Sequence, residues 1–287
     1  MKVLIALVGV VVGQGASRGT GIKLKRPSIR MVQRTAWYVG AASCPSKRLL
    51  AWECWPCKKA RETKPSDVYL FSNYRKRVEG YVLVDNPNKM VVVCFRGTNN
   101  LVLGERNRNH PQVLFPDIND PRVRVNQAFS EALDTLTPLF MPYLKSVMKP
   151  GYNVMVTGFS LGGAVASLAV VKIHNQLKIP FHQMTLITFG QPRTGNIYFA
   201  QAINDMPMRA ARVVNYDDPY PHSPPASNQD YTHHQNELYI DAAQTPHYCS
   251  TKVYEDPTCA NHISGLDYSP ASHLNAWNVS FNPIYGC

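Results

Sequence analysis

Apolar positions along the chain follow two alternating patterns. Short apolar runs, many with β-branched residues, occupy residues 78–84, 90–95, 154–157, 184–189 and 211–215 and predict buried strands. Residues 125–136 carry apolar side chains at intervals of three and four, and residues 27–42, 164–169 and 197–206 are also predicted as helices. Strands that alternate with helices predict an α/β fold, in which helices cover a mixed sheet.

Turn-forming and helix-breaking residues mark several ends of these elements. The sequence Asp-Asn-Pro-Asn at 85–88 predicts a hairpin loop between the strands 78–84 and 90–95. Pro138 and Pro142 are expected to end or kink the helix that begins near Val125. We expect a second hairpin over residues 231–240.

The N-terminus has the pattern of a secretory signal peptide. Lys2 supplies positive charge, residues 3–12 are apolar, and residues 13–16 form a short stretch of mostly small residues where cleavage could fall. This apolar run of about ten residues is too short to span a bilayer, and no later run approaches about eighteen. We therefore expect a secreted, extracellular protein with a signal peptide at 1–16 and a single α/β domain at 17–287.

The chain contains seven cysteines, which a secreted protein is expected to oxidise. Cys94 lies inside an apolar run and is predicted to be a buried free thiol. The other six can form three bridges, and their spacing alone leaves the pairing open. Two groups also resemble zinc sites: Cys54 with Cys57, and His247 and Cys249 with Cys259 and His262. After a signal peptide, structural disulfides are the favoured interpretation of both groups.

Positive charge is concentrated in the first half of the chain. Residues 1–125 carry 22 Lys and Arg against 8 Asp and Glu, whereas residues 126–287 carry 8 against 11. The basic clusters at 23–34, 58–64 and 75–77 lack interleaved aromatic residues and a nucleic-acid-binding motif, so we expect no nucleic-acid partner. An anionic lipid surface or a cell-wall polymer is the better functional hypothesis, and a solvated basic face is the alternative.

The most informative motif is Gly-x-Ser-x-Gly at residues 158–162. It follows a short β-branched run and precedes a helix of small residues, which is the strand–turn–helix context of a nucleophile elbow. Gly158 and Gly162 let the strand and the helix approach closely, and the turn lifts the Ser160 hydroxyl to the end of the sheet. The pattern therefore predicts Ser160 as a nucleophile.

Acyl transfer also needs a base, a carboxylate that orients the base, and oxyanion donors. In enzymes with such an elbow, the carboxylate and then the histidine follow the serine in the chain. Asp217 and Asp218, just after the predicted strand 211–215, are the carboxylate candidates, with turn or capping roles as the alternative. The candidate bases are His222, His233, His234, His247, His262 and His273. Pattern alone favours His273 without excluding the others.

Several segments together resemble the class 3 lipases, a fungal-type triacylglycerol lipase family that also includes feruloyl esterases and phospholipases. These segments are Phe-Arg-Gly-Thr at 95–98, residues 157–163, Thr-Phe-Gly-Gln-Pro-Arg-Thr-Gly-Asn at 188–196, Asp-Asp-Pro-Tyr-Pro at 217–221 with Pro-Pro at 224–225, and residues 233–239. The resemblance runs from about residue 27 to residue 287. It implies an α/β-hydrolase-like fold, with a mixed, mostly parallel sheet covered by helices, a nucleophile elbow and a lid.

The resemblance also implies roles for individual residues. Carried over position by position, the catalytic triad is Ser160 as nucleophile, Asp218 as orienting carboxylate and His273 as base. Asp218 is preferred to Asp217 because it keeps the family's register relative to Pro221.

Further parts of the site follow from the same resemblance. The oxyanion hole corresponds to the backbone N–H and hydroxyl of Thr98 and the backbone N–H of Leu161. The cysteine pattern is similar to that of fungal members and implies the bridges Cys44–Cys287, Cys54–Cys57 and Cys249–Cys259. No cofactor and no metal is implied.

Two departures from the family pattern bear on the site. Phe159 replaces the histidine that usually precedes the nucleophile, and we expect altered packing only. Residues 99–110 occupy the place of the lid but lack its usual tryptophan. Leu101, Val102 and Leu103 offer an apolar patch that could cover the site or contact lipid, and an ordinary surface loop is the alternative.

These observations predict a secreted serine ester hydrolase that acts on lipid esters, triacylglycerol first, at a lipid–water interface. The alternatives are a phospholipase A1 or feruloyl-type esterase of the same fold, or a non-catalytic lipid-binding protein. We expect a monomer, and Asn278-Val279-Ser280 is a candidate N-glycosylation site.

Overall fold

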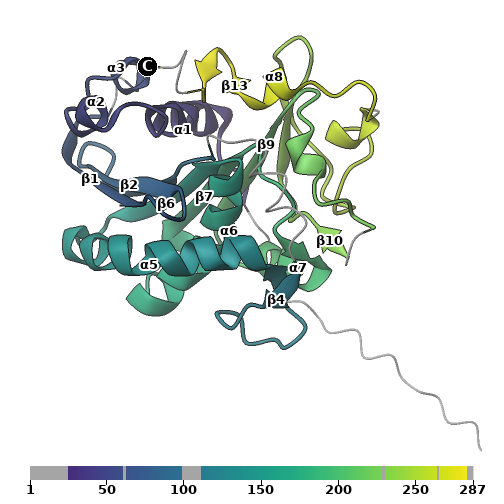
Figure 1. Ribbon diagram of the computed structural model, residues 1–287, viewed down its shortest axis with the longest axis horizontal. Helices are drawn as coiled ribbons and strands as arrows, with labels where there is room; N and C mark the ends of the chain where they lie inside the picture. The colour runs from purple at the N-terminus through teal and green to yellow at the C-terminus, as the bar shows by residue number, and fades with distance from the viewer. Residues whose placement is uncertain (1–24, 61–62, 99–110, 228–229, 264, 283–286) are drawn as a thin grey trace, which may run out of the picture.

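A sheet of eight strands crosses the middle of the molecule (Figure 1). The computed structural model describes residues 25–287 except 61–62, 99–110, 228–229, 264 and 283–286. In spatial order the strands are β1 (Pro65–Asn73), β2 (Val78–Asp85), β3 (Met90–Phe95), β6 (Asn153–Phe159), β7 (Met184–Phe189), β9 (Arg209–Asn215), β11 (Glu237–Ile240) and β12 (Pro246–Tyr248). From β3 to β11 the strands pair in parallel, and β1, β2 and β12 add antiparallel edges. The predicted mixed, mostly parallel sheet is confirmed.

Helices cover both faces of this sheet. Helix α1 (Ile29–Ala41) lies on one face, and α5 (Gln127–Val147) and α6 (Leu161–Leu177) lie on the other (Figure 1). In β3, Val91 and Val93 belong to the hydrophobic cluster of α5 and α6, whereas Val92 belongs to that of α1. Burial on both faces explains why the central strands are continuous apolar runs rather than alternating ones.

Most elements predicted from the apolar pattern are present. The hairpin around residues 85–88 joins β2 and β3, and the predicted helices at 27–42 and 197–206 correspond to α1 and to α7 (Ile197–Asn204). The side chain of Ser28 accepts a hydrogen bond from the Met31 N–H and so caps α1 at its start. Strand β1 was not predicted, because its side chains are mostly half-buried or exposed, with Phe71 as the one buried residue, and give a weak apolar pattern.

The expectation that proline ends the helix before the elbow is wrong. Helix α5 runs through Pro138 and Pro142 to Val147. Both prolines are exposed and lie four residues apart, so they share the solvent side of the helix, where water can satisfy the carbonyl groups that lose their N–H partners. Burial of Leu136, Phe140 and Leu144 on the opposite side continues across both prolines.

The second predicted hairpin is misplaced, because the antiparallel hairpin in this region joins β11 to β12 and not two strands within 231–240. Residues 231–240 contain two strands, but β10 (Tyr231–Thr232) pairs with β8 (Gly195–Asn196), whereas β11 pairs with β9 and β12. The pair β8–β10 belongs to a small sheet of order β10-β8-β5-β4, with β4 (Gln112–Leu114) and β5 (Arg124–Asn126).

Strands β13 (Asn275–Ala276) and β14 (Val279–Ser280) form a third, two-stranded sheet. Its turn carries Asn278, which is exposed.

Three disulfides join the six cysteines in the pairs Cys44–Cys287, Cys54–Cys57 and Cys249–Cys259. The first two bridges hold the region of α2 (Ser46–Leu50) and α3 (Trp55–Lys59). Cys94 is a buried free thiol as predicted, and burial raises its pKa, which keeps it protonated.

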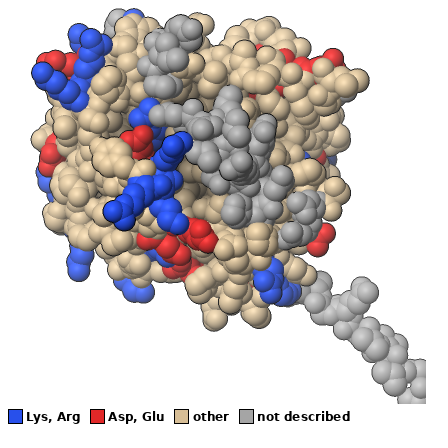
Figure 2. Space-filling view, viewed as in Figure 1, with Lys and Arg blue, Asp and Glu red and all other residues tan. Residues whose placement is uncertain are grey.

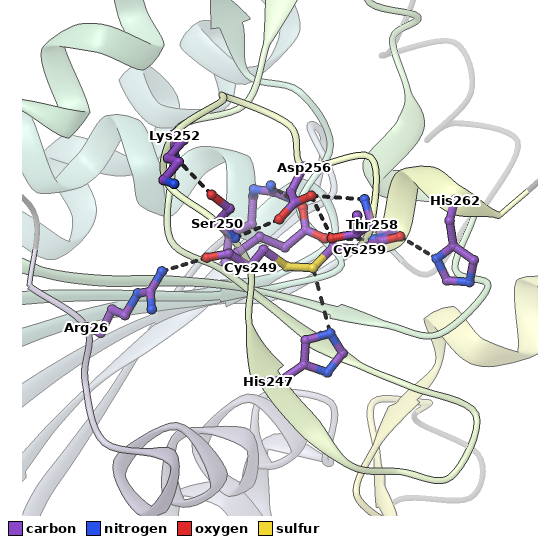
Figure 3. The surroundings of a disulfide bond; sticks show 12 residues. Arg26, His247, Cys249, Ser250, Lys252, Asp256, Thr258, Cys259 and His262 are labelled. Atoms are coloured by element: carbon purple, nitrogen blue, oxygen red, sulfur yellow. Dashed lines mark hydrogen bonds and ion pairs between the residues drawn. A yellow bond between two sulfur atoms is a disulfide. The ribbon is translucent and has the colours of Figure 1, made fainter.

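The Cys249–Cys259 bridge lies where a zinc site was the alternative (Figure 3). Glu237 and the two sulfur atoms form the one group of potential metal ligands within the described residues. His262 Nδ1 lies 2.5 Å from the Cys259 carbonyl oxygen, and His247 Nε2 lies 3.8 Å from the Cys259 sulfur. Because sulfur atoms in a disulfide cannot act as thiolate ligands, this arrangement favours a structural bridge.

No helix among the described residues is both long and apolar enough to cross a membrane. The remaining short helices are α8 (Pro270–His273), η1 (Phe181–Gln183), η2 (Tyr220–His222) and η3 (Ala260–His262).

Candidate active site

Ser160 sits in a strained turn between β6 and α6. Its backbone angles are φ 54° and ψ −125°, a conformation that residues with a side chain adopt rarely. A Cβ atom on Gly158 would lie 2.2 Å from the Gly162 carbonyl oxygen, and one on Gly162 would lie 2.2 Å from the Phe95 carbonyl oxygen. Glycine is therefore required at both positions for the strand and the helix to approach this closely.

Three side chains from distant parts of the chain form a hydrogen-bonded series. His273 Nε2 lies 2.9 Å from Ser160 Oγ, and His273 Nδ1 lies 2.9 Å from Asp218 Oδ2. All three residues are buried, with exposed fractions of 7% for Ser160, 2% for His273 and 1% for Asp218. A carboxylate only accepts hydrogen bonds, so Nδ1 carries the proton and Nε2 is left to accept from the Ser160 hydroxyl.

Asp218, rather than Asp217, is the carboxylate that reaches the imidazole. It follows β9 at the edge of the sheet where the parallel strands end, the same edge that carries Ser160 after β6. The Tyr220 N–H donates to Asp218 Oδ1 at 2.9 Å and fixes the carboxylate from its other side. The backbone carbonyl of Asp217 accepts from the Ser269 N–H, which ties this loop to the segment that leads into His273.

Two aromatic rings enclose the imidazole of His273. The Tyr220 ring stacks on it with centroids 3.9 Å apart, and the Phe159 ring lies at 4.5 Å. The packing change expected at Phe159 thus falls on the imidazole itself. Sequence reasoning did not identify Tyr220, although it lies in the segment 217–221 that carried the resemblance.

Gly190 is a further site residue that sequence reasoning missed. Its φ is +54°, and a Cβ atom there would lie 2.7 Å from both Nδ1 and Cε1 of His273 and 3.0 Å from Asp218 Oδ2. The absent side chain therefore leaves the room in which the imidazole and the carboxylate meet. The signal was its place directly after the predicted strand 184–189, inside a segment typical of the family.

The two residues predicted to form the oxyanion hole, Thr98 and Leu161, lie on either side of the elbow. Leu161 is the first residue of α6, and N–H groups in the first turn of a helix have no partner within that helix. Thr98 follows Gly97, whose Cβ position is 3.0 Å from the Phe159 carbonyl oxygen. The chain segment that carries Thr98 thus lies against the residue before Ser160.

The other candidate histidines make different contacts. His233 Nε2 donates to the Pro221 carbonyl at 2.7 Å, and His234 Nδ1 donates to the Gln235 carbonyl at 3.0 Å. Burial lowers the pKa of His234 to about 3 and lowers that of His233 well below its usual value, and the nearby Arg212 charge adds to both shifts. Burial and the charge of Arg193 also lower the pKa of His222. These three side chains are therefore neutral structural groups.

Two buried ion pairs support the loops around Asp218. Arg193 Nη2 lies 2.5 Å from Glu255 Oε2, and Arg212 Nη2 lies 2.6 Å from Glu237 Oε2. Burial alone would raise the pKa of Glu255, but the hydrogen bonds and charge of Arg193 hold it well below its usual value. Arg193 Nη1 also donates to the His222 and Pro224 carbonyls and so fixes the segment that follows Asp218.

Two further predictions fall outside the described residues. Leu101, Val102 and Leu103 of the expected lid lie in the segment 99–110, and the expected signal peptide lies in residues 1–24. Both stay predictions.

A strained serine at a strand–helix turn, joined through an imidazole to a buried carboxylate at the carboxyl edge of a parallel sheet, defines an α/β serine hydrolase. The family model described as Lipase (class 3) matches residues 92–228. The chain belongs to the class 3 lipase family, and as a member it is a carboxylic ester hydrolase.

Known proteins support this assignment in sequence and in structure. A lipase of Rhizopus niveus is 26% identical over 272 residues, which cover 92% of this chain and 68% of that protein. The secreted mono- and diacylglycerol lipase 1 of Fusarium solani is 31% identical over 166 residues, or 57% of this chain and 48% of that protein. The crystal structure of a lipase from Rhizopus microsporus var. chinensis has the same fold, with a TM-score of 0.77, 23% identity, and coverage of 97% of this chain and 99% of that one.

Proposed function

We propose that the protein is a secreted lipase that hydrolyses triacylglycerol and related glycerides through an acyl-enzyme on Ser160. The observation that carries the proposal is the pair of 2.9 Å contacts that His273 makes with Ser160 and Asp218. The names of relatives support the substrate class, since the Rhizopus proteins are lipases and the Fusarium protein is a mono- and diacylglycerol lipase.

The chemistry begins with a proton transfer. His273 Nε2 takes the Ser160 proton while Oγ attacks the ester carbonyl carbon, and the tetrahedral intermediate then expels the alcohol, which takes that proton from the imidazole. Asp218 stabilises the imidazolium and holds the ring in its tautomer. Water then attacks the acyl-enzyme by the same route and releases the carboxylic acid.

The developing oxyanion is the second requirement. The N–H groups of Leu161 and Thr98 and the Thr98 hydroxyl are the proposed donors. Because they belong to a helix start and an adjoining loop, they are oriented before the substrate binds. Burial of the triad excludes water and strengthens these interactions.

Secretion is part of the proposal. Three disulfides are typical of proteins from oxidising compartments, and the Fusarium relative is named as secreted. Exposure of Asn278 in the turn between β13 and β14 is compatible with a glycan at this position. We expect a monomer that acts at a lipid–water interface.

Covalent labelling tests the proposal most directly. A long-chain organophosphonate should add to Ser160, as read by mass spectrometry of the intact protein and its peptides. Ser160→Ala should abolish both labelling and ester hydrolysis, while Ser146→Ala, at an exposed helix position, should retain both. Retained hydrolysis of short acyl esters by Ser160→Ala would falsify the assignment.

A substrate panel separates the alternatives. Emulsified triacylglycerol, diacylglycerol, phosphatidylcholine vesicles and a feruloyl ester would be compared at equal protein concentration. The proposal expects the glycerides to be hydrolysed fastest. Preference for phospholipid or for the aryl ester would replace it with a phospholipase A1 or a feruloyl-type esterase, and labelling without any hydrolysis would indicate a lipid-binding protein.

A further inference from the structure

A cavity outside the candidate active site lies on the first half of α1 and the end of α3. The cavity has a volume of about 400 Å³ and shares no lining residue with the candidate active site. Among its described lining residues, Arg30, Arg34 and Lys59 are cationic and none is acidic, while Trp37 supplies an aromatic wall. Asp85 is buried behind the cavity, where its carboxylate accepts from Asn88, which in turn accepts from Arg34. The charged side chains among the described lining residues are therefore all basic.

Large apolar side chains are exposed on α3 and at the end of α2. Trp55 is 44% exposed, and its ring meets Trp37 edge to face with centroids 5.2 Å apart. The Lys59 ammonium lies 5.4 Å from the centre of the Trp55 ring. Leu50, at the end of α2, is 51% exposed.

The local fold keeps Trp55 on the surface. Trp55 lies between Cys54 and Cys57, which are joined in a disulfide, and the next residue, Pro56, is buried. Helix α3 therefore holds its tryptophan outward next to cations rather than packing it into the core. An exposed tryptophan beside lysine is typical of side chains that lie at a membrane–water boundary.

Positive charge extends from the cavity over the two short helices. Lys47, Arg48, Lys58 and Lys59 are all exposed on α2 and α3, with Glu53 as the acidic residue between the two helices. Figure 2 shows Lys and Arg side chains gathered at the upper left of the molecule, over these two helices. Each basic side chain near an anionic membrane contributes to attraction over about a Debye length.

We propose that this region, the α1–α3 surface, docks the protein on anionic phospholipid. The cavity lined by Arg30, Arg34 and Lys59 takes a headgroup phosphate, while Trp55 and Leu50 enter the boundary between headgroups and acyl chains. A soluble anion would use the cations but would leave both apolar side chains in water. The inference rests on the proposed function in one respect, that the substrate of the enzyme is a lipid.

Vesicle partitioning tests the inference. Ser160→Ala protein, which leaves the vesicles intact, would be sedimented with phosphatidylcholine vesicles that contain or lack phosphatidylglycerol. We expect binding only to the anionic vesicles, weakened by salt. The double variant Arg30→Ala with Lys59→Ala should lose about tenfold in partitioning, which corresponds to about 1.4 kcal/mol. Trp55→Ala should lose a similar factor.

Matched controls lie in the turn between β1 and β2. Arg75→Ala with Lys76→Ala removes the same charge from another exposed basic cluster, and Tyr74→Ala removes a ring that is 85% exposed. Both controls should bind like the parent protein. Equal losses in the controls would mean that binding follows net charge alone, and would overturn the inference.

Two more outcomes keep the inference separate from the proposed function. Loss of binding to inorganic phosphate in the Arg30 and Lys59 double variant, with vesicle binding retained, would assign the cavity to a soluble anion and overturn the lipid assignment. With Ser160 restored, all docking variants should hydrolyse a soluble short ester at the parent rate. If Ser160 proves unreactive, the proposed function fails while the vesicle result still stands by itself.

Discussion

The imidazole of His273 is held in place from several directions at once. Asp218 and Ser160 bind its two nitrogen atoms, and the Tyr220 and Phe159 rings lie against it. A side chain with this many neighbours has little freedom to leave the geometry that the reaction needs. The residue without a side chain, Gly190, is as important as those that touch the ring, because it leaves the space that the ring occupies.

Gly190→Ala should therefore lower kcat. The new methyl group would overlap the imidazole, and a displacement of about 1 Å from reactive geometry costs on the order of a hundredfold in rate. Hydrolysis of a soluble short ester would be measured, with kcat expected to fall and KM to change little. Gly151→Ala is the control, since Gly151 has a φ of +77° with nothing within 4 Å of its Cβ position. Wild-type turnover in Gly190→Ala would show that the overlap is relieved without moving His273.

Thr98→Val tests the proposed oxyanion donor. The substitution removes the hydroxyl but keeps the shape and the backbone N–H. Loss of one such donor typically costs about 2.7–4 kcal/mol in transition-state stabilisation, so kcat should fall by two to three orders of magnitude, roughly. Thr98→Ser retains the hydroxyl and should recover much of the rate, and thermal unfolding of the two variants should be alike. An unchanged kcat in Thr98→Val would mean that the donor lies elsewhere.

Prediction from sequence agrees with the structure where the geometry of the site is set by neighbouring residues. Ser160 and its flanking glycines form one continuous turn, so their spacing carries the geometry. Tyr220 and Gly190 act on His273 across many intervening residues, and their residue types alone say nothing of that contact. The choice of Asp218 over Asp217 came from resemblance to a family, and so did the exclusion of the other histidines, since pattern alone only favoured His273.

At the scale of elements too, local patterns were predicted from the sequence and contacts between distant segments were not. Strands buried on both faces were found because their apolar runs are continuous, whereas the pairing of β10 and β11 depended on partners far away in the chain. Helix α5 shows that burial along one side can outweigh two prolines on the other. Propensity is a local preference, and packing decides whether it is overridden.

The prolines in α5 are consequently expected to lower stability. Pro142→Ala would restore an N–H donor inside the helix at an exposed position, and Pro is about 3 kcal/mol less favourable than Ala in a helix interior. Since proline also restricts the unfolded chain, we expect a net gain of about 1–2 kcal/mol in the free energy of unfolding. Urea titration would measure it, with Lys145→Ala as an exposed control in the same helix. A loss of stability would indicate that Pro142 makes a contact that the helix needs.

At the scale of the whole molecule, the part of the chain after Asp218 contains several buried ionisable groups. His222, His233 and His234 are neutral in the folded protein, and the carboxylate of Glu255 is ionised beside Arg193. Through Arg193 and Glu255, hydrogen bonds join the loop after Asp218 to the segment at 250–258 and to the backbone of His233, so ionisation of Glu255 supports the loop that carries Asp218.

The buried histidines should make the fold sensitive to mild acid. Their folded pKa values lie below the unfolded value of about 6.5, so above that pH they contribute nothing to the pH dependence of stability. Below it the unfolded chain binds protons that the folded chain does not, so all three histidines lower the free energy of unfolding as the pH falls. For His234, whose folded pKa is about 3, the loss by pH 5 should be about 2 kcal/mol. Glu255 adds to the loss only below about pH 4.5, because a carboxylate with a lowered pKa stabilises the fold until the unfolded state protonates.

Urea titrations between pH 8 and pH 5 would measure this loss, and His234→Gln isolates one contributor. The variant should lose less stability than the parent between pH 7 and pH 5, by about 2 kcal/mol, even if it is less stable at every pH because its new amide fits the site less well. Between pH 8 and pH 7 the two curves should run parallel, since the imidazole is neutral in both states there. Parallel curves down to pH 5 would mean that His234 takes up its proton in the folded protein, and would contradict the lowered pKa of this imidazole.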